Sequence, residues 1–361
     1  MKQKINVASL FSGIGGFEEG LKIGGLSSNI VFASEIDKFA QISYLANFKT
    51  ENLHGDITTI GEDEIPDHEL LLAGFPCQSF SIAGKREGFE DARGTLFFDV
   101  ARILNKKKPK FFLLENVKNL VSHDGGNTMN EILNILKDLD YTVDFTVINS
   151  TEAGVPQNRE RTYICGIYKY KVEKYVIDLR SSKVNKLKQK LNKKGYSSFN
   201  FFNSLEFNAN KNVLEDVLLC ETEEKYYLNR DEINSFLNSI NINFNGNRET
   251  KIIKILDLPK DIHNDLQRQR RVYSTKGISP TILARSDAPK VLISEDGRYR
   301  IRKITPVESF YIQGFDKVFV ENIKNTGMSD TQMYKQSGNA VSPPVISAIL
   351  KKLYKEYISN A

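Results

Sequence analysis

The sequence predicts an α/β fold with a mostly parallel sheet. Short apolar runs, typical of buried strands, alternate with segments of helical periodicity. Glycines separate the first run from the first helix, and acidic or reactive side chains follow several of the runs. Because α/β proteins bind ligands at the carboxyl ends of their parallel strands, we expect these side chains to share one edge of the sheet.

Composition narrows the class of protein. The length of 361 residues predicts roughly two domains. A hydrophobic content of 40% with 26% charged residues is ordinary for a globular protein, and no apolar run approaches the ~20 residues of a membrane span. We therefore expect a cytoplasmic protein with no membrane contact. The three cysteines lie far apart, which argues against a disulfide framework and against structural zinc.

A glycine-rich turn follows the first predicted strand, at 5–11. Gly13, Gly15 and Gly16 precede a helical pattern at 17–21. Glycines between a strand and a helix allow a ligand to approach the backbone at the helix N-terminus. Their spacing differs from that of dinucleotide sites, so the turn indicates either a nucleotide-like cofactor or a tight turn alone.

Two acidic residues favour the cofactor. Glu35 ends the predicted strand 30–34, ~20 residues after the glycines, where a carboxylate commonly accepts hydrogen bonds from ribose hydroxyls. Asp56 follows another short element and would face an adenine amino group. Each acid alone is more typical of a solvated loop, but consecutive β-α units ending in such residues indicate a cofactor site.

A candidate nucleophile lies at the next strand end. The apolar run 70–73 ends at Gly74 and Pro76, which places Cys77 on the following loop. A cysteine there is a nucleophile if its thiolate is stabilised, and otherwise a buried structural residue. Glu115 ends the neighbouring run 111–114, where a carboxylate suits acid–base chemistry or caps a helix.

Further elements connect these motifs. The polar, glycine-spaced segment 83–94 predicts a mobile lid, which the resemblance described below extends to 78–96. Arg159 and Arg161 alternate, so an extended backbone would direct both to one face, toward carboxylates, a base oxygen or a phosphate. Helical spacing predicts helices at 95–106, 127–139 and 345–357, and apolar runs predict strands at 141–149 and 162–167.

Two basic segments suggest an anionic partner. Residues 180–194 hold seven basic side chains and no acid, with apolar residues at helical spacing. We expect lysines of this helix, including Lys186, Lys188 and Lys190, to contact phosphates or solvent. Between 263 and 303, ten basic residues stand against four acids. There Arg268, Gln269 and Arg271 suit base edges, with a salt-bridged loop as the alternative. The stretch 196–262 shows only one clear element, a short helix at 212–219.

Five motifs in a fixed order now reveal a resemblance: Phe11–Gly16, Gly74–Gln78, Glu115–Val117, Gln157–Arg161 and Gly338–Val341. The chain resembles DNA (cytosine-5) methyltransferases over nearly its whole length outside about 175–262, and residues 84–103 and 271–278 look like small bacterial members. The resemblance implies a Rossmann-like fold of an S-adenosyl-methionine-dependent methyltransferase with a smaller target-recognition domain. It divides the chain into a catalytic domain (1–175), a recognition domain (176–327) and a returning segment (328–361).

The resemblance also implies roles for single residues. Cys77 would attack C6 of a flipped-out cytosine, Glu115 would bind N3, and Arg161 with Arg159 would steady the base carbonyl and Glu115. Ile36 departs from the aromatic residue that a small bacterial member has beside the adenine. The implied cofactor-binding residues are Phe11, Gly13, Ile14, Gly15, Gly16, Glu35, Ile36, Asp56, Ile57, Pro76, Leu96, Asn339 and Ala340. The implied DNA-binding residues are Ser81, Lys85, Arg93, Arg268, Gln269, Arg271 and Tyr273.

The expected partners follow from the same family. Double-stranded DNA is the substrate, S-adenosyl-methionine the cofactor, no metal is needed, and a restriction endonuclease acts separately from a monomeric methylase. A tRNA cytosine-5 methyltransferase would use the same chemistry, although the basic target region favours DNA. A non-catalytic DNA-binding relative is expected to lack Cys77 or Glu115, and both are present. An NAD oxidoreductase explains the glycines but not the cysteine.

Overall fold

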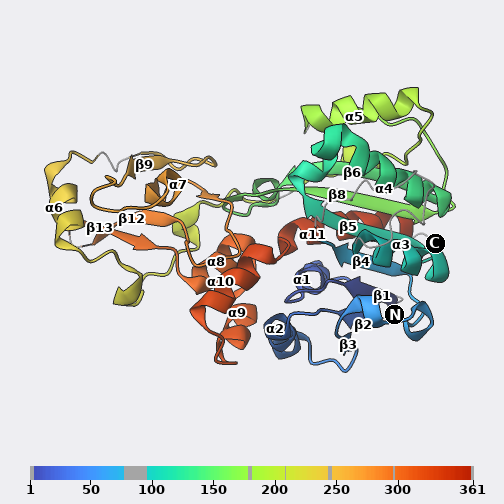
Figure 1. The fold of residues 1–361 in the computed structure, drawn as a ribbon, viewed down its shortest axis with the longest axis horizontal. Helices are drawn as coiled ribbons and strands as arrows, with labels where there is room; N and C mark the ends of the chain where they lie inside the picture. The colour runs from blue at the N-terminus through green and yellow to red at the C-terminus, as the bar shows by residue number, and fades with distance from the viewer. Residues whose placement is uncertain are drawn as a thin grey trace. The chain divides into compact units, whose positions relative to one another are not determined.

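The computed structural model describes residues 4–76, 96–177, 181–207, 209–242, 246–295 and 297–358. The chain forms two compact units (Figure 1). Unit 1 comprises 1–148, 160–206 and 346–361, and unit 2 comprises 149–159 and 207–345. The units thus assign 176–206 to unit 1 and 328–345 to unit 2, and the domain boundaries expected at 175 and 328 stay predictions.

Unit 1 is built on a seven-stranded sheet of order β3-β2-β1-β4-β5-β8-β6, which confirms the predicted α/β fold with a mostly parallel sheet. Neighbouring strands from β3 to β5 pair in parallel, and β8 pairs antiparallel with β5. The strands are β1 (Ile5–Leu10), β2 (Ser28–Ser34), β3 (Leu53–His54), β4 (Leu70–Gly74), β5 (Phe111–Val117), β6 (Tyr141–Asn149) and β8 (Glu160–Tyr168).

The register of the strands aligns their carboxyl ends. Leu10 pairs with Ser34 on one side and with Ala73 on the other, and Gly74 pairs with Glu115. Residues that directly follow β1, β2 and β4 therefore lie along one edge of the sheet, beside the end of β5. This edge is where the sequence places its candidate site.

Three helices that the sequence pattern predicts pack on this sheet: α3 (Leu96–Lys107), α4 (Asn127–Asp138) and α5 (Ser182–Lys193). Apolar residues of α3, α4 and α5 form one buried cluster with β1, β4, β5 and β6. Asp37 caps α2 by accepting hydrogen bonds from the backbone N–H groups of Phe39 and Ala40. Further helices are α1 (Gly16–Ile23), α2 (Lys38–Phe48) and α11 (Pro343–Leu353).

Unit 2 carries a four-stranded sheet of order β13-β12-β10-β9 and a two-stranded sheet of β11 with β7. Its strands are β7 (Gln157–Asn158), β9 (Lys254–Asp257), β10 (Arg271–Ser274), β11 (Ser279–Pro280), β12 (Lys290–Glu295) and β13 (Arg298–Lys303). Its helices are α6 (Asp231–Ser239), α7 (Gln267–Arg270), α8 (Pro306–Gln313), α9 (Lys317–Lys324) and α10 (Asp330–Asn339). The short helix expected at 212–219 is a 3₁₀ turn, Leu214–Asp216.

The structure corrects the expectation for Lys188. Its side chain is 1% exposed, and its Nζ lies 2.9 Å from Oδ1 of the fully buried Asp144. Lys188 therefore contacts neither solvent nor phosphate, because it occupies the face of α5 that packs on the core. In the part of the chain that the structure describes, we find no helix with the length and apolar character that a membrane crossing requires.

Candidate active site

The glycine-rich turn after β1 has a backbone that few side chains tolerate. Gly13 and Gly15 have φ values of 57° and 91°, in the left-handed region. A Cβ on Gly15 would lie 2.1 Å from Cε2 of Phe48, so a side chain has no room there. Phe11 also has a positive φ, of 53°, a conformation that costs a non-glycine residue about 1–2 kcal/mol. Such strain is typical of functional turns.

Glu35 ties this turn to the end of β2. Its Oε2 accepts a hydrogen bond from the Gly13 N–H at 2.8 Å, and its Oε1 accepts one from the Asp37 N–H at 2.8 Å. A carboxylate offers about four lone-pair positions, so two backbone bonds leave acceptor capacity for hydroxyl donors. The half-buried Glu35 can therefore hold the turn and still accept from a ligand.

The neighbouring strand ends supply a polar and an apolar group. Asp56 accepts hydrogen bonds at its Oδ1 from the N–H of Thr58 at 3.0 Å and from the Thr58 hydroxyl at 2.8 Å. Ile57 is buried, whereas Ile36 is 68% exposed. An exposed isoleucine next to Glu35 is an apolar surface that a flat ring can cover.

The chain before the candidate nucleophile is held in place. Asn116 donates a hydrogen bond from Nδ2 to the Phe75 carbonyl at 2.8 Å, and the Phe75 ring packs on Phe97 at 5.5 Å between centroids. Pro76 is exposed, and Leu96 is half-buried at the start of α3. Four predicted site residues lie outside the described residues: Cys77, Ser81, Lys85 and Arg93, together with the rest of the predicted lid through residue 95.

Glu115 forms the centre of the described site. In the antiparallel register of β5 with β8, Val117 faces Arg161, and this brings Arg161 Nε to 3.1 Å from Oε1 of Glu115. The Arg161 side chain is 18% exposed and the Glu115 side chain 11%, so water screens the attraction between their charges only partly. Arg161 also donates from Nη1 to the Glu160 carbonyl at 2.9 Å, which fixes its orientation.

Arg159 binds different groups from Arg161. Its guanidinium is buried within unit 2 and donates to the carbonyls of Gly338 at 3.1 Å and Ala340 at 2.8 Å, and to that of Ile282 at 3.5 Å. These bonds fix the turn at the end of α10, where the Asn339 side chain is exposed and Ala340 is half-buried. The structure thus gives Arg159 a structural role, and its catalytic role stays a prediction.

Sequence analysis missed the buried amides that hold the same turn. Gln157 donates to Oε1 of Gln313 at 2.7 Å and accepts from the Ile282 N–H at 2.9 Å. Gln313 in turn donates to the carbonyls of Ser337 and Ala340, each at 3.0 Å. Gly338 lies in this packing with no space for a Cβ, which would sit 2.3 Å from the backbone N of Ala284. A glycine between polar residues was the only sequence signal for this close approach.

The predicted base-reading residues are bound to acids. Gln269 donates to Oδ2 of Asp287 at 3.0 Å, and a guanidinium nitrogen of Arg268 lies 3.7 Å from the same oxygen. Arg271 lies 3.9 Å from Asp257. Tyr273 is buried, and its burial raises the pKa of its hydroxyl against the opposing effect of the Arg271 charge. Their DNA-binding role stays a prediction. The ion pairs of Arg268 with Asp287 and of Arg271 with Asp257 are those that the alternative, a salt-bridged loop, expects.

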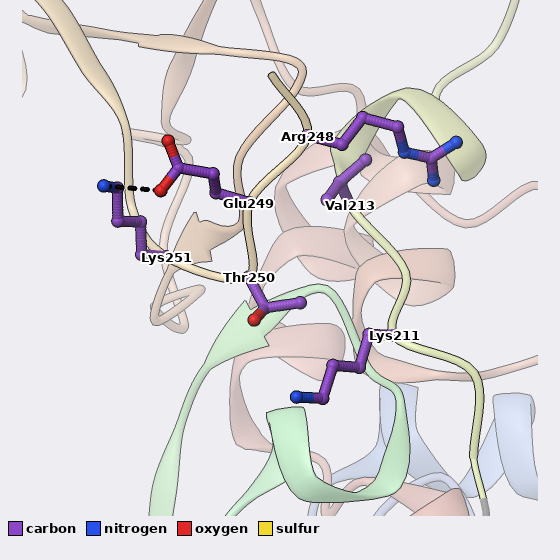
Figure 2. A pocket seen from close by; sticks show the side chains of 6 residues that line it. All are labelled: Lys211, Val213, Arg248, Glu249, Thr250 and Lys251. Atoms are coloured by element: carbon purple, nitrogen blue, oxygen red, sulfur yellow. Dashed lines mark ion pairs between the residues drawn. The ribbon is translucent and has the colours of Figure 1, made fainter. Parts of the chain in front are cut away.

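Unit 2 also holds a cavity in the stretch where few elements were predicted. It has a volume of about 470 Å³ and is lined by Lys211, Val213, Arg248, Glu249, Thr250 and Lys251 (Figure 2). Lys251 pairs with Glu249 at 2.5 Å, and the Arg248 side chain extends away from that pair in Figure 2, toward the acids Glu215 and Asp216. The basic groups therefore do not converge on one point.

Comparisons with known proteins agree with this geometry. The model of the family "C-5 cytosine-specific DNA methylase" matches residues 5–355, which confirms the resemblance predicted from the motifs. The chain is 40% identical to the type II methyltransferase M.SsoII of Shigella sonnei, over 97% of this chain and 80% of that protein. It is 36% identical to the type II methyltransferase M.HhaI of Haemophilus parahaemolyticus, over 94% of this chain and 91% of that protein. The solved structure of the S. pombe Dnmt2 methyltransferase shares the fold, with a TM-score of 0.67 at 16% identity over 98% and 99% of the chains.

Proposed function

The chain belongs to the C-5 cytosine-specific DNA methylase family and is a DNA (cytosine-5) methyltransferase of the type II restriction-modification kind. We propose that it methylates one cytosine of a short duplex sequence and that its cofactor is S-adenosyl-methionine. The proposal rests chiefly on the placement of Glu115. Its pairing with Gly74 sets a carboxyl group held by Arg161 beside the end of β4, and Cys77 follows that end by three residues in the sequence.

The cofactor site fits the described edge of unit 1. Glu35 retains acceptor capacity for ribose hydroxyls, Asp56 lies at the end of the neighbouring element, and the exposed Ile36 offers a surface for adenine. The turn through Gly13 and Gly15 lets a ligand approach the backbone closely. S-adenosyl-methionine supplies an electrophilic methyl group there, and no metal enters the scheme.

The chemistry assigned to the chain begins with the thiolate of Cys77. It attacks C6 of cytosine and forms a C–S bond, and the electrons displaced from the C5–C6 double bond move toward N3. Glu115 in its protonated form donates a hydrogen bond to N3 and stabilises this charge, which leaves C5 nucleophilic. Arg161 holds Glu115 in line with the base. C5 would then bond to the methyl group as the bond between that methyl and the cofactor sulfur breaks, with the electron pair left on sulfur. Transfer of the C5 proton to water would re-form the C5–C6 double bond and break the C–S bond at C6, which releases Cys77 as the thiolate.

Two further features belong to the proposal. C6 is stacked inside a duplex, so the target cytosine must be flipped out, and the segment 78–96 would close over it. We further propose a cytoplasmic monomer whose cognate endonuclease, where there is one, acts as a separate protein. Recognition of the flanking bases would fall to unit 2, and a cofactor contact by Asn339 and Ala340 stays a prediction from the resemblance.

Bisulfite sequencing of plasmid DNA from cells that express the chain tests this function. We expect protected cytosines at one short recurring sequence, and none with the Cys77→Ala variant. Protection in tRNA but not in plasmid DNA would replace the DNA substrate with tRNA. Protection in neither would contradict the proposed function.

A further inference from the structure

Helix α5 presents a stripe of lysines on its outer face. Lys183, Lys186, Lys190 and Lys193 follow one another at intervals of three, four and three residues, so they share one side of the helix. All four are exposed, and within the described residues none of them takes part in an ion pair. No acidic residue occurs from 181 to 205, so nothing on the same helix neutralises the stripe.

The opposite face of α5 anchors the helix. Val184, Leu187 and Leu191 join the main core of unit 1. Between them lies Lys188, which pairs with Asp144 at 2.9 Å and stands over the rings of Phe145 and Tyr175 at 5.5 and 5.7 Å. Asp144 is fixed in turn by the Phe202 N–H at 2.8 Å.

Because of this anchoring, α5 differs from a flexible basic tail. A buried ion pair costs desolvation energy and is best understood as a device that sets register. Here it determines which lysines turn inward and which turn outward. The backbone that carries the outer stripe is therefore fixed on unit 1, so only the lysine side chains have to be ordered when they meet a partner.

Helix α5 lies close to the segment that follows β5, the strand that carries Glu115. The 3₁₀ segment η4 (Lys118–Gly126) comes directly after β5, and Leu187 of α5 packs within 3.6 Å of the Cβ position at Gly126. Figure 1 shows α5 along the outside of the layer that contains α4 and β6. The stripe thus belongs to the unit that carries Glu115.

The spacing of the stripe matches a nucleic-acid backbone. Ten residues of helix separate its first and last lysine, a rise of about 15 Å at about 1.5 Å per residue. One strand of B-DNA presents a phosphate every ~3.4 Å of axis, so about four phosphates span the stripe. Lysine is a point charge that suits phosphates rather than base edges.

We propose that α5 binds the phosphate backbone of duplex DNA outside the recognised sequence, through Lys183, Lys186, Lys190 and Lys193. This inference rests on the proposed function, because it takes the same DNA as the partner. The contact adds affinity that is independent of sequence, and it holds the flanking duplex while the target base is processed.

The test compares two variants with equal charge loss. In the α5 variant, Lys183, Lys186, Lys190 and Lys193 are changed to Gln. In the control, four exposed lysines beside the start of β1, the start of β5 and the end of β8 are changed to Gln: Lys4, Lys108, Lys110 and Lys169. Circular dichroism and thermal melting establish that both variants fold.

The measurement is the salt dependence of DNA binding by fluorescence anisotropy. Two duplexes carry the target site, one of roughly 10 base pairs, or about one helical turn, and one with several turns of flanking DNA. On the long duplex, we expect the slope of log affinity against log salt to fall by about 3 to 4 for the α5 variant, at about 0.9 for each phosphate contact. The control variant and the short duplex should show the wild-type slope.

Each other outcome overturns the inference. An unchanged slope for the α5 variant means that the stripe contacts no DNA, and an equal fall in both variants means that net charge alone acts. An equal fall on both duplexes places α5 at the target itself. Loss of binding to structured RNA without any loss on the duplex assigns the stripe to RNA. A wild-type chain that binds duplex DNA but methylates none of it contradicts the proposed function instead.

Discussion

Arg161 Nε lies 3.1 Å from Oε1 of Glu115, across the antiparallel pair of β5 and β8. The guanidinium fixes the carboxylate at the carboxyl end of β5, beside the end of β4. Because Glu115 also pairs in register with Gly74, the two motifs that the sequence separates by about forty residues meet at one point.

The first prediction concerns Glu115 itself. Glu115→Gln keeps the shape of the side chain but lowers its ability to stabilise the ring during attack, so kcat should fall about 10²–10⁴-fold. Arg161→Lys should lower kcat by a smaller factor, because an ammonium cannot reproduce the fork of the guanidinium. Single-turnover methyl transfer measures both, with gel shifts to establish that DNA still binds. A Glu115→Gln enzyme with wild-type kcat would remove Glu115 from the mechanism.

The second prediction concerns the cysteines. Cys77→Ala should abolish methyl transfer and leave duplex binding intact, because the nucleophile is lost and the phosphate contacts are not. Cys220→Ala is the matched control, since Cys220 is exposed and lies in unit 2. Cys165 is buried, which raises the pKa of its thiol and leaves it unreactive. Tritiated methyl incorporation is the assay, and turnover by Cys77→Ala would refute the assignment.

A trapping experiment gives the same residue a positive signature. Elimination must remove the substituent at C5 as a proton, and fluorine cannot leave in this way. We therefore expect a duplex with 5-fluorocytosine at the target to form a covalent adduct only when S-adenosyl-methionine is present. Denaturing electrophoresis detects it as a slow band, which should be missing for Cys77→Ala. Wild-type enzyme without an adduct on the correct DNA would exclude covalent catalysis.

The sequence predicted most of the edge that carries Glu115 because it depends on local patterns. Apolar runs mark the strands, and parallel strands bring their ends together, so the sequence predicted that these strand ends share one edge. The pairing of Gly74 with Glu115 is the register that the structure adds. The hydrogen bonds of Arg159 could not be predicted from local patterns, because its carbonyl partners lie 123 to 181 residues away along the chain. Lys188 was misassigned although its position, four residues after Val184 and three before Leu191, put it on the apolar face.

The buried pair yields a prediction on stability. Lys188→Ala would leave Asp144 as an uncompensated buried charge, so the free energy of unfolding should fall by about 3–5 kcal/mol. Replacing both residues, as Lys188→Met with Asp144→Leu, should recover much of the loss. Lys190→Ala is the control on the exposed face of the same helix. Urea denaturation measures the difference, and equal stability for Lys188→Ala and Lys190→Ala would contradict the structure.

Glu18 predicts a dependence of stability on pH. It is buried at the start of α1, accepts a hydrogen bond from the Tyr44 hydroxyl at 3.2 Å, and its burial raises the pKa of its carboxyl. An acid whose folded pKa exceeds its unfolded pKa contributes stability below the unfolded value and loses it as pH rises through the folded value. Glu18→Gln cannot ionise, so it should gain stability relative to wild type between pH 5 and pH 8. A constant difference across thermal melts in that range would contradict this.

The last prediction concerns which residues recognise the DNA sequence. The candidates are the loop 268–271 and the stretch 196–262. Arg271 and Arg268 are 41% and 53% exposed, and neither carboxylate beside them lies closer than 3.7 Å, so both can exchange an acid for a guanine edge. Loss of a bidentate base contact costs about 1–3 kcal/mol at one base pair, so Arg271→Ala should relax the preference at one position of the target. Methylation profiling on a library of randomised sites reads the preference directly, and Arg298→Ala, an exposed arginine in the same basic segment, is the control. If Arg268→Ala, Gln269→Ala and Arg271→Ala all keep the wild-type consensus, target recognition is assigned to residues 196–262 instead. Lys211 and Thr250, which line the cavity in that stretch, would then be the next residues to substitute.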